Sequence, residues 1–267
     1  MPLPLIMGIV NITPDSFSDG GLFNSPIVAR DRAIEMCGQG ADWIDVGGES
    51  TRPGATCVPA DQELARVIPV IREIVAADPS IHISIDTSKS IVARQAIHLG
   101  ARMINDVTAG KHDPAMFDVA AELNVPMILM HMNGDPATMQ DAPAYDNIVQ
   151  HVHDHLQERV QSARSAGIGT VYVDPGIGFG KTVEHNLELL RNLNTFADLA
   201  DGIVLGISRK RFLGSLIGED NPTKRDQATA LLHALLWNAP VLMIRVHDVQ
   251  LHAQLRMLGN SLLQSNH

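Results

Sequence analysis

The amino-acid sequence predicts an α/β protein, a single (β/α)8 TIM barrel, and three observations support that prediction. Short apolar runs rich in valine and isoleucine alternate strictly with longer segments of helical apolar spacing. Eight such units occur in 267 residues, the size expected of this barrel. A polar residue stands at or just beyond the end of each apolar run. Strict alternation implies parallel strands joined by right-handed crossovers, so these polar residues would share one face.

The predicted strands and helices follow from the spacing of the apolar residues. The clearest helix is expected over residues 61–77, where Leu64, Ile68, Ile71 and Val75 fall on one face, and another over residues 146–166. Further helices are predicted near Arg30, Val92, Met116, Leu187, Ala230 and Leu255. The predicted strands are residues 5–10, 43–46, 81–85, 103–107, 126–130, 171–173, 203–206 and 241–246.

No low-complexity segment or proline-rich linker divides the chain, so residues 1–267 are predicted to form one domain. A doubly wound open sheet is the alternative architecture. The barrel is favoured by the polar residues at the strand ends, because in a barrel those ends form the face that carries active sites. These residues are Asn11, Glu49, Asp86, Asn105, His131, Asp174, Ser208 and Arg245.

Composition narrows the partners and the compartment. The formal net charge of -10 argues against nucleic acid or an anionic membrane surface as a partner, so an anionic ligand would need a local basic cluster. Cys37 and Cys57 form no metal-binding spacing and no disulfide framework, which indicates a reducing compartment. The first residues lack a basic signal region, and no apolar run approaches membrane-spanning length. We therefore expect a cytoplasmic protein.

The segment over residues 174–181, Asp-Pro-Gly-Ile-Gly-Phe-Gly-Lys, follows a predicted strand and is the most informative in the chain. It is not a P-loop, because Pro175 occupies the position of the first glycine. It is not a dinucleotide fingerprint, because Lys181 stands where the third glycine belongs. A structural glycine turn would account for the glycines, but not for Asp174 at the strand end or for Phe179. We interpret the segment as a functional loop.

Long loops are predicted after strands one and two. Residues 11–21 are turn-forming residues that include Phe17, and residues 47–54 form a second glycine-bracketed loop with Arg52. Long loops after barrel strands are usually functional, so we interpret both as lids, although an ordinary surface loop and an Arg52–Glu49 pair are the alternatives. Asn11 could offer a neutral oxygen to a metal ion.

Three polar residues end apolar strands and form the predicted ligand socket. A carboxylate there needs donors for both oxygens, and a ring edge with adjacent N–H and NH2 groups provides them. Asp86, Asn105 and Asp174 are therefore predicted to bind a nitrogen heterocycle.

The basic cluster follows strands seven and eight, where barrels commonly bind phosphate. It consists of Ser208-Arg209-Lys210-Arg211 and Arg245-Val246-His247. Because Arg245 and His247 alternate along an extended segment, both are predicted to face one anion. A solvated turn is the alternative for Arg209 and Arg211.

Four histidines receive no functional role. His151 and His155 would share one helix face, but a third metal ligand is absent from that segment, so a solvated helix is predicted for them and His153. His131 lies between two methionines, which indicates packing.

Together these motifs resemble the dihydropteroate synthase family of pterin-binding barrels over nearly the whole chain. The segment 104–107 alone would also suit other pterin-binding barrels. The segments that carry the resemblance are residues 11–21, 47–54, 84–87, 104–107, 130–132, 174–181 with 185–187, 208–210 and 245–247.

The resemblance implies a transferase of folate biosynthesis. The reaction joins 6-hydroxymethyl-7,8-dihydropterin pyrophosphate to 4-aminobenzoate and gives 7,8-dihydropteroate and pyrophosphate. The family also implies Mg2+ as a cofactor, sulfonamides as competitive inhibitors and a homodimer. We expect a dissociative reaction in which Asp86 stabilises the pterin cation and Arg245 and His247 stabilise the leaving pyrophosphate.

The resemblance also implies a role for each matching residue. The pterin would contact Asp86, Asn105, Asp174 and Lys210. The 4-aminobenzoate would contact Thr51, Pro53, Phe179 and Lys210, together with Phe17 and Arg52. Pyrophosphate would contact Asn11, Thr51, Arg245 and His247, with Asn11 also a metal ligand. The implied catalytic residues are Asp86, Asp174, Lys210, Arg245 and His247.

The chain departs from the family at two positions. Arg211 stands where many members have serine, and Asn133 stands where glutamine is common. A folate- or pterin-dependent methyltransferase of the same barrel family is the alternative function, although it has no use for the Thr51-Arg52-Pro53 loop or the phosphate cluster. A nucleotide hydrolase is disfavoured by Pro175. A non-catalytic binding protein is disfavoured because the polar set is complete.

Overall fold

Eight parallel strands close into a barrel in the computed structural model, which describes residues 3–13, 26–51, 54–134, 139 and 143–263. The strands are β1 (Leu5–Asn11), β2 (Trp43–Gly47), β3 (Ile83–Asp86), β4 (Met103–Asp106), β5 (Met127–Met130), β6 (Val171–Asp174), β7 (Ile203–Leu205) and β8 (Val241–Val246). Each strand pairs with the next, and β8 returns to β1, so that Met7 lies opposite Arg245. This closure confirms the predicted barrel and excludes the open sheet.

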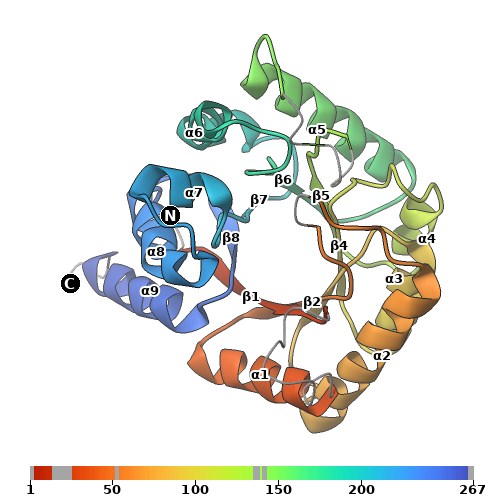
Figure 1. The fold of residues 1–267 in the computed structure, drawn as a ribbon. Helices are drawn as coiled ribbons and strands as arrows, with labels where there is room; N and C mark the ends of the chain where they lie inside the picture. Colours follow the sequence, from red (N-terminus) through yellow and green to blue (C-terminus); the bar gives the residue numbers. More distant parts are fainter. Residues whose placement is uncertain (1–2, 14–25, 52–53, 135–138, 140–142, 264–267) are drawn as a thin grey trace.

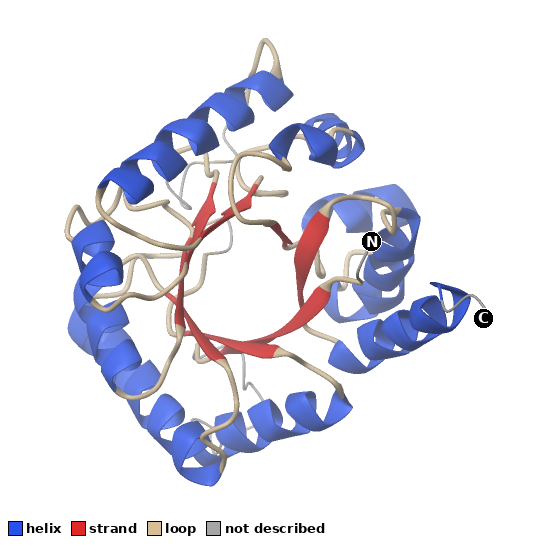
Figure 2. Ribbon diagram, turned by 180° about the vertical axis from the view of Figure 1, so that it is seen from behind, coloured by secondary structure: helices blue, strands red, loops and turns tan. Residues whose placement is uncertain are grey.

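Helices surround the barrel on its outside (Figures 1 and 2). They are α1 (Pro26–Gln39), α2 (Ala60–Ala77), α3 (Ser90–His98), α4 (Met116–Glu122), α5 (Ile148–Ser165), α6 (Val183–Arg191), α7 (Arg211–Ile217), α8 (Asp226–Leu235) and α9 (Val249–Leu263), with 3-10 helices η2 (Leu193–Phe196) and η3 (Pro222–Arg225). None of the helices within the described ranges is long and apolar enough to cross a membrane.

Most strand bounds agree with the sequence prediction to within one residue, and the larger differences concern β3 and α7. Strand β3 begins at Ile83 and not at residue 81. Helix α7 was not predicted, because the strict alternation of strands and helices assigned only one helix, near Ala230, to the segment between strands seven and eight. Gly218 ends α7 in a left-handed conformation with a φ of 71°, a common signal for the end of a helix.

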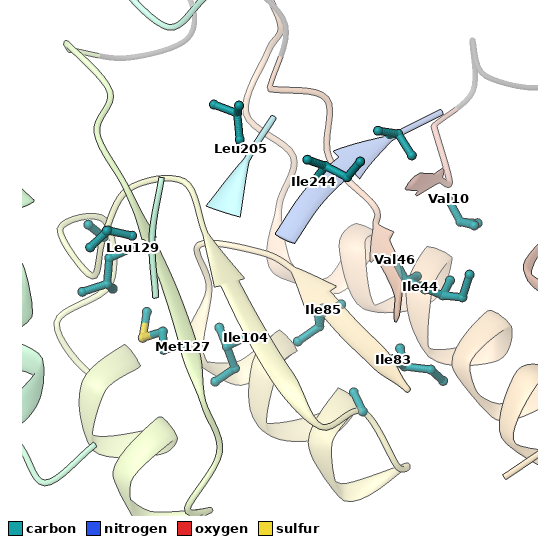
Figure 3. Packing of buried hydrophobic residues seen from close by; sticks show 14 of the residues in the cluster. Val10, Ile44, Val46, Ile83, Ile85, Ile104, Met127, Leu129, Leu205 and Ile244 are labelled. Atoms are coloured by element: carbon teal, nitrogen blue, oxygen red, sulfur yellow. The ribbon is translucent and has the colours of Figure 1, made fainter. Parts of the chain in front are cut away.

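Two apolar layers hold the barrel, and strand alternation separates them. Side chains such as Ile44, Val46, Ile83 and Ile85 project from β2 and β3 into the main core beneath the helices (Figure 3). The intervening residues of each strand face the barrel interior, because successive side chains point to opposite faces. A second cluster fills the lower part of that interior, formed by Met7, Met103, Ile128, Val204 and Met243.

The long loops predicted after strands one and two fall between β1 and α1 and between β2 and α2, and residues 14–25 and 52–53 of these segments lie outside the described part of the chain. Three predicted site residues in them, Phe17, Arg52 and Pro53, lie outside the described part of the chain. Of the other predicted residues in these segments, Asn11 ends β1, and Thr51 is half-buried after β2.

Candidate active site

Charged side chains form a layer at the carboxyl ends of the strands. This layer lies above the second apolar cluster, which contains Met7, Met103 and Met243. Register pairing aligns Gly47 of β2 with Asp86 of β3, and Asp86 with Asn105 of β4. Asp174 ends β6 opposite Met130 of β5. The predicted socket residues therefore come from strand ends at the same face of the barrel.

Arg245 joins two carboxylates inside the barrel. Its Nε donates to Asp45 Oδ2 over 2.6 Å, and its Nη2 donates to Asp86 Oδ2 over 2.6 Å. Asn105 Nδ2 donates to the same Asp45 oxygen over 3.0 Å. Asp45 is fully buried, and Asp86 and Asn105 are nearly so. The network connects four strands, β2, β3, β4 and β8.

The electrostatics of this network depend on burial. Burial of Asp86 raises its pKa to about 7, and the charge of Arg245 opposes that rise. The carboxyl groups of Asp45, Glu63 and Asp106 add to the rise. Burial would lower the pKa of Arg245, but Asp45 and Asp86 raise it. The guanidinium therefore stays charged while Asp86 can change its protonation state near neutral pH.

Asp45 is a residue that the motif reasoning missed. It stands in the middle of the apolar strand Trp43–Gly47, one position out of phase with Ile44 and Val46. That alternation was a usable signal, because a carboxylate facing a barrel interior needs a partner. Its other oxygen, Oδ1, has no hydrogen-bond partner among the described residues.

Asp174 is held at the start of the β6–α6 loop. It is buried, and its Oδ1 accepts a hydrogen bond from the Gly176 backbone N–H over 2.7 Å. Burial raises its pKa, while Lys210 and the Gly176 hydrogen bond oppose the rise. As predicted, this buried carboxylate has partners. They are the Gly176 N–H of its own loop and the nearby Lys210.

The three glycines of this loop each have a backbone conformation that residues with a side chain rarely adopt. Gly176, Gly178 and Gly180 have φ values of 69°, 85° and 65°. A Cβ on Gly176 would lie 1.8 Å from the His131 carbonyl oxygen, and one on Gly178 would lie 2.9 Å from Lys210 Cδ. The glycines let the loop pack tightly against β5 and Lys210.

Lys210 connects this loop to the charged network. Its Nζ donates to the Ile177 carbonyl and lies 4.4 Å from the centre of the Phe179 ring. Burial lowers the pKa of Lys210 to about 8, while Asp174 raises it and Arg245 lowers it further. A Cβ on Gly206 would lie 3.5 Å from Asp174 Oδ2 and 3.9 Å from Lys210 Nζ, so both groups converge at the end of β7.

The rest of the basic cluster divides into paired and exposed groups. Ser208 Oγ lies 2.9 Å from His247 Nδ1 and accepts from the His247 backbone N–H over 3.1 Å. Arg209 is not a solvated turn residue, because it makes a two-point ion pair with Asp226 over 2.7 and 2.6 Å. Arg211 is exposed at the first position of α7.

Arg245 and His247 follow the predicted alternation, but most of the Arg245 guanidinium is engaged. Its Nε and Nη2 bind the two carboxylates, which leaves Nη1 to meet an anion without breaking those pairs.

Glu49 belongs to a buried ion cluster at the base of the β2–α2 loop. Lys89 Nζ donates to Glu49 and, over 2.6 Å, to the fully buried Glu63. Glu49 also accepts from the Val58 backbone N–H over 3.0 Å. Both oxygens of Glu49 thus have partners in the described residues, and the motif reasoning missed Lys89 and Glu63.

The packing predicted for His131 is confirmed, and among the helix histidines His151 is exposed as predicted whereas His155 is partly buried. His131 is 1% exposed, its Nδ1 lies 2.9 Å from Lys181 Nζ, and its ring packs edge-on against those of His151 and His155. Burial lowers the pKa of His155 to about 4. The prediction of a solvated helix was therefore wrong for His155, whose ring faces β5. Among the described residues, no group of His, Cys, Asp and Glu is arranged to hold a metal ion.

A separate cavity of about 20 Å³ lies beside the starts of β1 and β8, under α8 and α9. That volume suits about one water molecule, so this cavity is too small for a heterocyclic substrate.

Comparisons with known proteins agree with this geometry. A family model described as pterin binding enzyme matches residues 7–247. The chain is 46% identical over 248 residues to a dihydropteroate synthase of Streptococcus pyogenes, covering 92% of this chain and 90% of that protein. A structure of Xanthomonas albilineans dihydropteroate synthase with 4-aminobenzoic acid has a TM-score of 0.92 and 42% identity, covering 99% and 94% of the two chains. A Yersinia pestis dihydropteroate synthase in a sulfonamide drug complex has a TM-score of 0.92 and 36% identity, covering 98% and 95%.

Proposed function

The chain belongs to the family of pterin-binding enzymes, and from that membership we propose that its barrel mouth carries out the dihydropteroate synthase reaction. It is a transferase of folate synthesis that joins 6-hydroxymethyl-7,8-dihydropterin pyrophosphate to 4-aminobenzoate and releases pyrophosphate. The observation that carries this assignment is the charged layer of Asp86, Asn105, Asp174, Lys210 and Arg245 at the strand ends.

The socket supplies complementary groups for a pterin ring. Asp86 and Asp174 offer carboxylate oxygens to ring N–H and NH2 groups, and Asn105 offers an amide. Lys210 lies beside Asp174 and can donate to a ring acceptor there. Removal from water strengthens these hydrogen bonds.

The chemistry that this arrangement supports is dissociative. The carbon–oxygen bond to pyrophosphate breaks with its electron pair, and the positive charge that develops on the pterin is stabilised by the Asp86 carboxylate. The lone pair of the neutral arylamine forms the new carbon–nitrogen bond, and the nitrogen then loses a proton to water. Charge on the departing pyrophosphate would meet Nη1 of Arg245 and the imidazole of His247.

The 4-aminobenzoate site is proposed at the Phe179 face of the loop. The ring of Phe179 is half-buried beside Lys210, so a flat arylamine can pack against it within reach of the pterin methylene. Thr51, Phe17, Arg52 and Pro53 keep their proposed roles there. Because sulfonamides have the same arylamine, we expect them to compete with 4-aminobenzoate in steady-state assays. Inhibition that excess 4-aminobenzoate does not relieve would contradict this site.

Magnesium is the proposed cofactor, and the donor chemistry fits it. Asn11 ends β1 and offers one neutral oxygen, and Mg2+ commonly takes few protein ligands and completes its shell with substrate phosphates and water. When bound, the ion would neutralise charge on the pyrophosphate group. The cytoplasm is the proposed compartment, supported by the free thiols of Cys37 and Cys57.

A homodimer is the proposed assembly. Large apolar side chains are exposed on the neighbouring helices α8 and α9, among them Leu231, Leu235, Met257, Leu258 and Leu262. A second copy of the chain would remove this apolar surface from water.

The direct test of the reaction is pyrophosphate release. We expect release only when pterin pyrophosphate and 4-aminobenzoate are both present, with dihydropteroate formed in equal amount. Methyl transfer from a folate without pyrophosphate release would instead establish the methyltransferase alternative.

A further inference from the structure

Asp45 touches Asn105, which is assigned to the pterin, and Arg245, which is assigned to pyrophosphate, although no motif gives Asp45 a role. Its Oδ2 accepts from Arg245 Nε over 2.6 Å and from Asn105 Nδ2 over 3.0 Å. The side chain is fully buried between β1 and β3. An aspartate that is removed from water and shared by two functional neighbours needs an explanation beyond packing.

The Asn105 amide can present either of two opposite chemistries to a ligand. Its nitrogen donates hydrogen bonds and its oxygen accepts them, and rotation of the amide by half a turn exchanges the two. A carboxylate oxygen beside a guanidinium accepts and does not donate, so the amide nitrogen must face Asp45. The amide oxygen is consequently directed away from Asp45.

We propose that Asp45 is a positioning residue that fixes the Asn105 amide so that it presents an acceptor to the pterin, and that holds Arg245 against Asp86. The inference rests on the proposed function and adds a determinant of substrate recognition to it. The class of ligand that this arrangement selects is a heterocycle with a ring N–H or amino donor opposite Asn105. A heterocycle with an acceptor at that position would face the amide oxygen without a hydrogen bond.

The test compares Asp45→Ala, Asn105→Asp and the double variant. Asp45→Ala removes the acceptor that fixes the amide, so kcat/KM for pterin pyrophosphate should fall by about 10- to 100-fold. Asn105→Asp places two carboxylates within hydrogen-bond distance and should also be impaired. In the double variant the carboxylate introduced at position 105 offers only acceptors and can pair with Arg245. The double variant should therefore exceed both single variants, recovering about 10-fold over Asp45→Ala.

This pattern separates positioning from packing. Asp45→Ala and the double variant share the same cavity at residue 45, so a purely structural role predicts no recovery, and a double variant no better than Asp45→Ala would overturn the proposal. The KM for 4-aminobenzoate should stay close to that of the unmodified enzyme in all three. The matched control is Asp42→Asn, which removes a carboxylate that accepts from the Ile6 N–H and pairs with Arg256 just before β2, and it should leave both KM values unchanged.

A second variant keeps the proposal testable if Asp45→Ala does not fold. Asp45→Asn keeps an acceptor atom but removes one negative charge near Asp86, which also faces Arg245, Glu63 and Asp106. When kcat/KM for the pterin substrate is plotted against pH, its rise on the acid side should move to lower pH. The negative charge at residue 45 no longer raises the pKa of Asp86, while the charge of Arg245 still lowers it. If this rise stays at the same pH in Asp45→Asn, the proposal that Asp45 holds Arg245 against Asp86 is contradicted.

Failure of the proposed reaction can be recognised separately. Calorimetric titration with 6-hydroxymethyl-7,8-dihydropterin pyrophosphate measures recognition without turnover. If the unmodified enzyme binds this ligand but releases no pyrophosphate, the reaction assignment fails, and the Asp45 proposal is decided by the binding constants of the same variants. Equal affinity of the unmodified enzyme and Asp45→Ala would then overturn it.

Discussion

Individual charged residues in this barrel contact one another at the expense of their own solvation. Arg245 sits between Asp45 and Asp86, and Lys210 lies beside Asp174; the three aspartates are buried and the two cations are partly buried. Buried ion pairs of this kind seldom add net stability, because desolvation offsets most of the attraction. Their position at the strand ends is that of the proposed ligand site.

Substitution of Asp174 at the end of β6, or of Lys210 after β7, should reduce turnover without unfolding the protein. We expect Asp174→Asn and Lys210→Ala each to lower kcat/KM by on the order of 100-fold, because a charge-assisted hydrogen bond in a water-excluded site contributes about 2 to 3 kcal/mol. Steady-state kinetics on variants with unchanged circular dichroism checks this. Near-normal turnover in either variant would remove that residue from the socket.

The pKa values of two socket residues predict a narrow pH optimum. Asp86 is protonated below about 7 and then cannot accept a second ring donor, so kcat/KM for the pterin substrate should rise as the pH rises through 7. Lys210 loses its charge above about 8, so kcat/KM should fall again there. Lys210→Arg should move only this fall on the basic side, to higher pH, because the guanidinium keeps its charge. A profile that is flat across both values would contradict these assignments.

At the scale of elements, the β6–α6 loop is the segment whose backbone the site depends on. Its glycines permit the approach to β5, its Asp174 end is tied to Gly176, and its Lys181 end is buried against His131 and the Phe179 carbonyl. The loop is therefore fixed at both ends, and Phe179 is presented from between them.

Two glycine substitutions separate backbone strain from steric exclusion. Gly176 and Gly218 have nearly equal φ values of 69° and 71°, but a Cβ on Gly218 would meet nothing within 4 Å. Gly218→Ala should lower the free energy of unfolding by about 1 kcal/mol, through strain alone. Gly176→Ala should cost about 3 kcal/mol or more, because it also collides with the His131 carbonyl. Chemical denaturation measures both, and equal losses would contradict the close approach.

At the scale of the whole molecule, the proposed dimer face lies on α8 and α9, away from the strand-end face. Leu235 and Leu262 are 82% and 85% exposed there. A charged residue in a buried apolar interface is costly, so Leu235→Glu should convert a dimer to a monomer in sedimentation analysis. The matched control is Ile91→Glu on α3, also exposed, which should leave the dimer intact. A monomeric unmodified protein would refute the assembly.

Local sequence patterns were enough to establish the barrel, because each strand and most helices have a period that does not depend on distant residues. The unit count and the polar strand ends then predicted the functional face, and Asp86, Asn105, Asp174 and Arg245 lie at or near those strand ends. Helix α7 escaped detection because one helix was expected between β7 and β8, and that position was assigned to α8. Family motifs added the reaction, which elementary patterns could not supply.

The contacts between charged groups, by contrast, became known only from the folded chain. Asp45 and Arg245 are 200 positions apart in sequence, and their contact exists because β8 closes the barrel next to β1. That closure also commits Arg245 to two carboxylates, and other tertiary contacts bury Lys89 with Glu63 and place His155 beside His131. Local sequence patterns report which face a side chain occupies, whereas a pKa or an ion pair depends on neighbours that only strand order and register bring together.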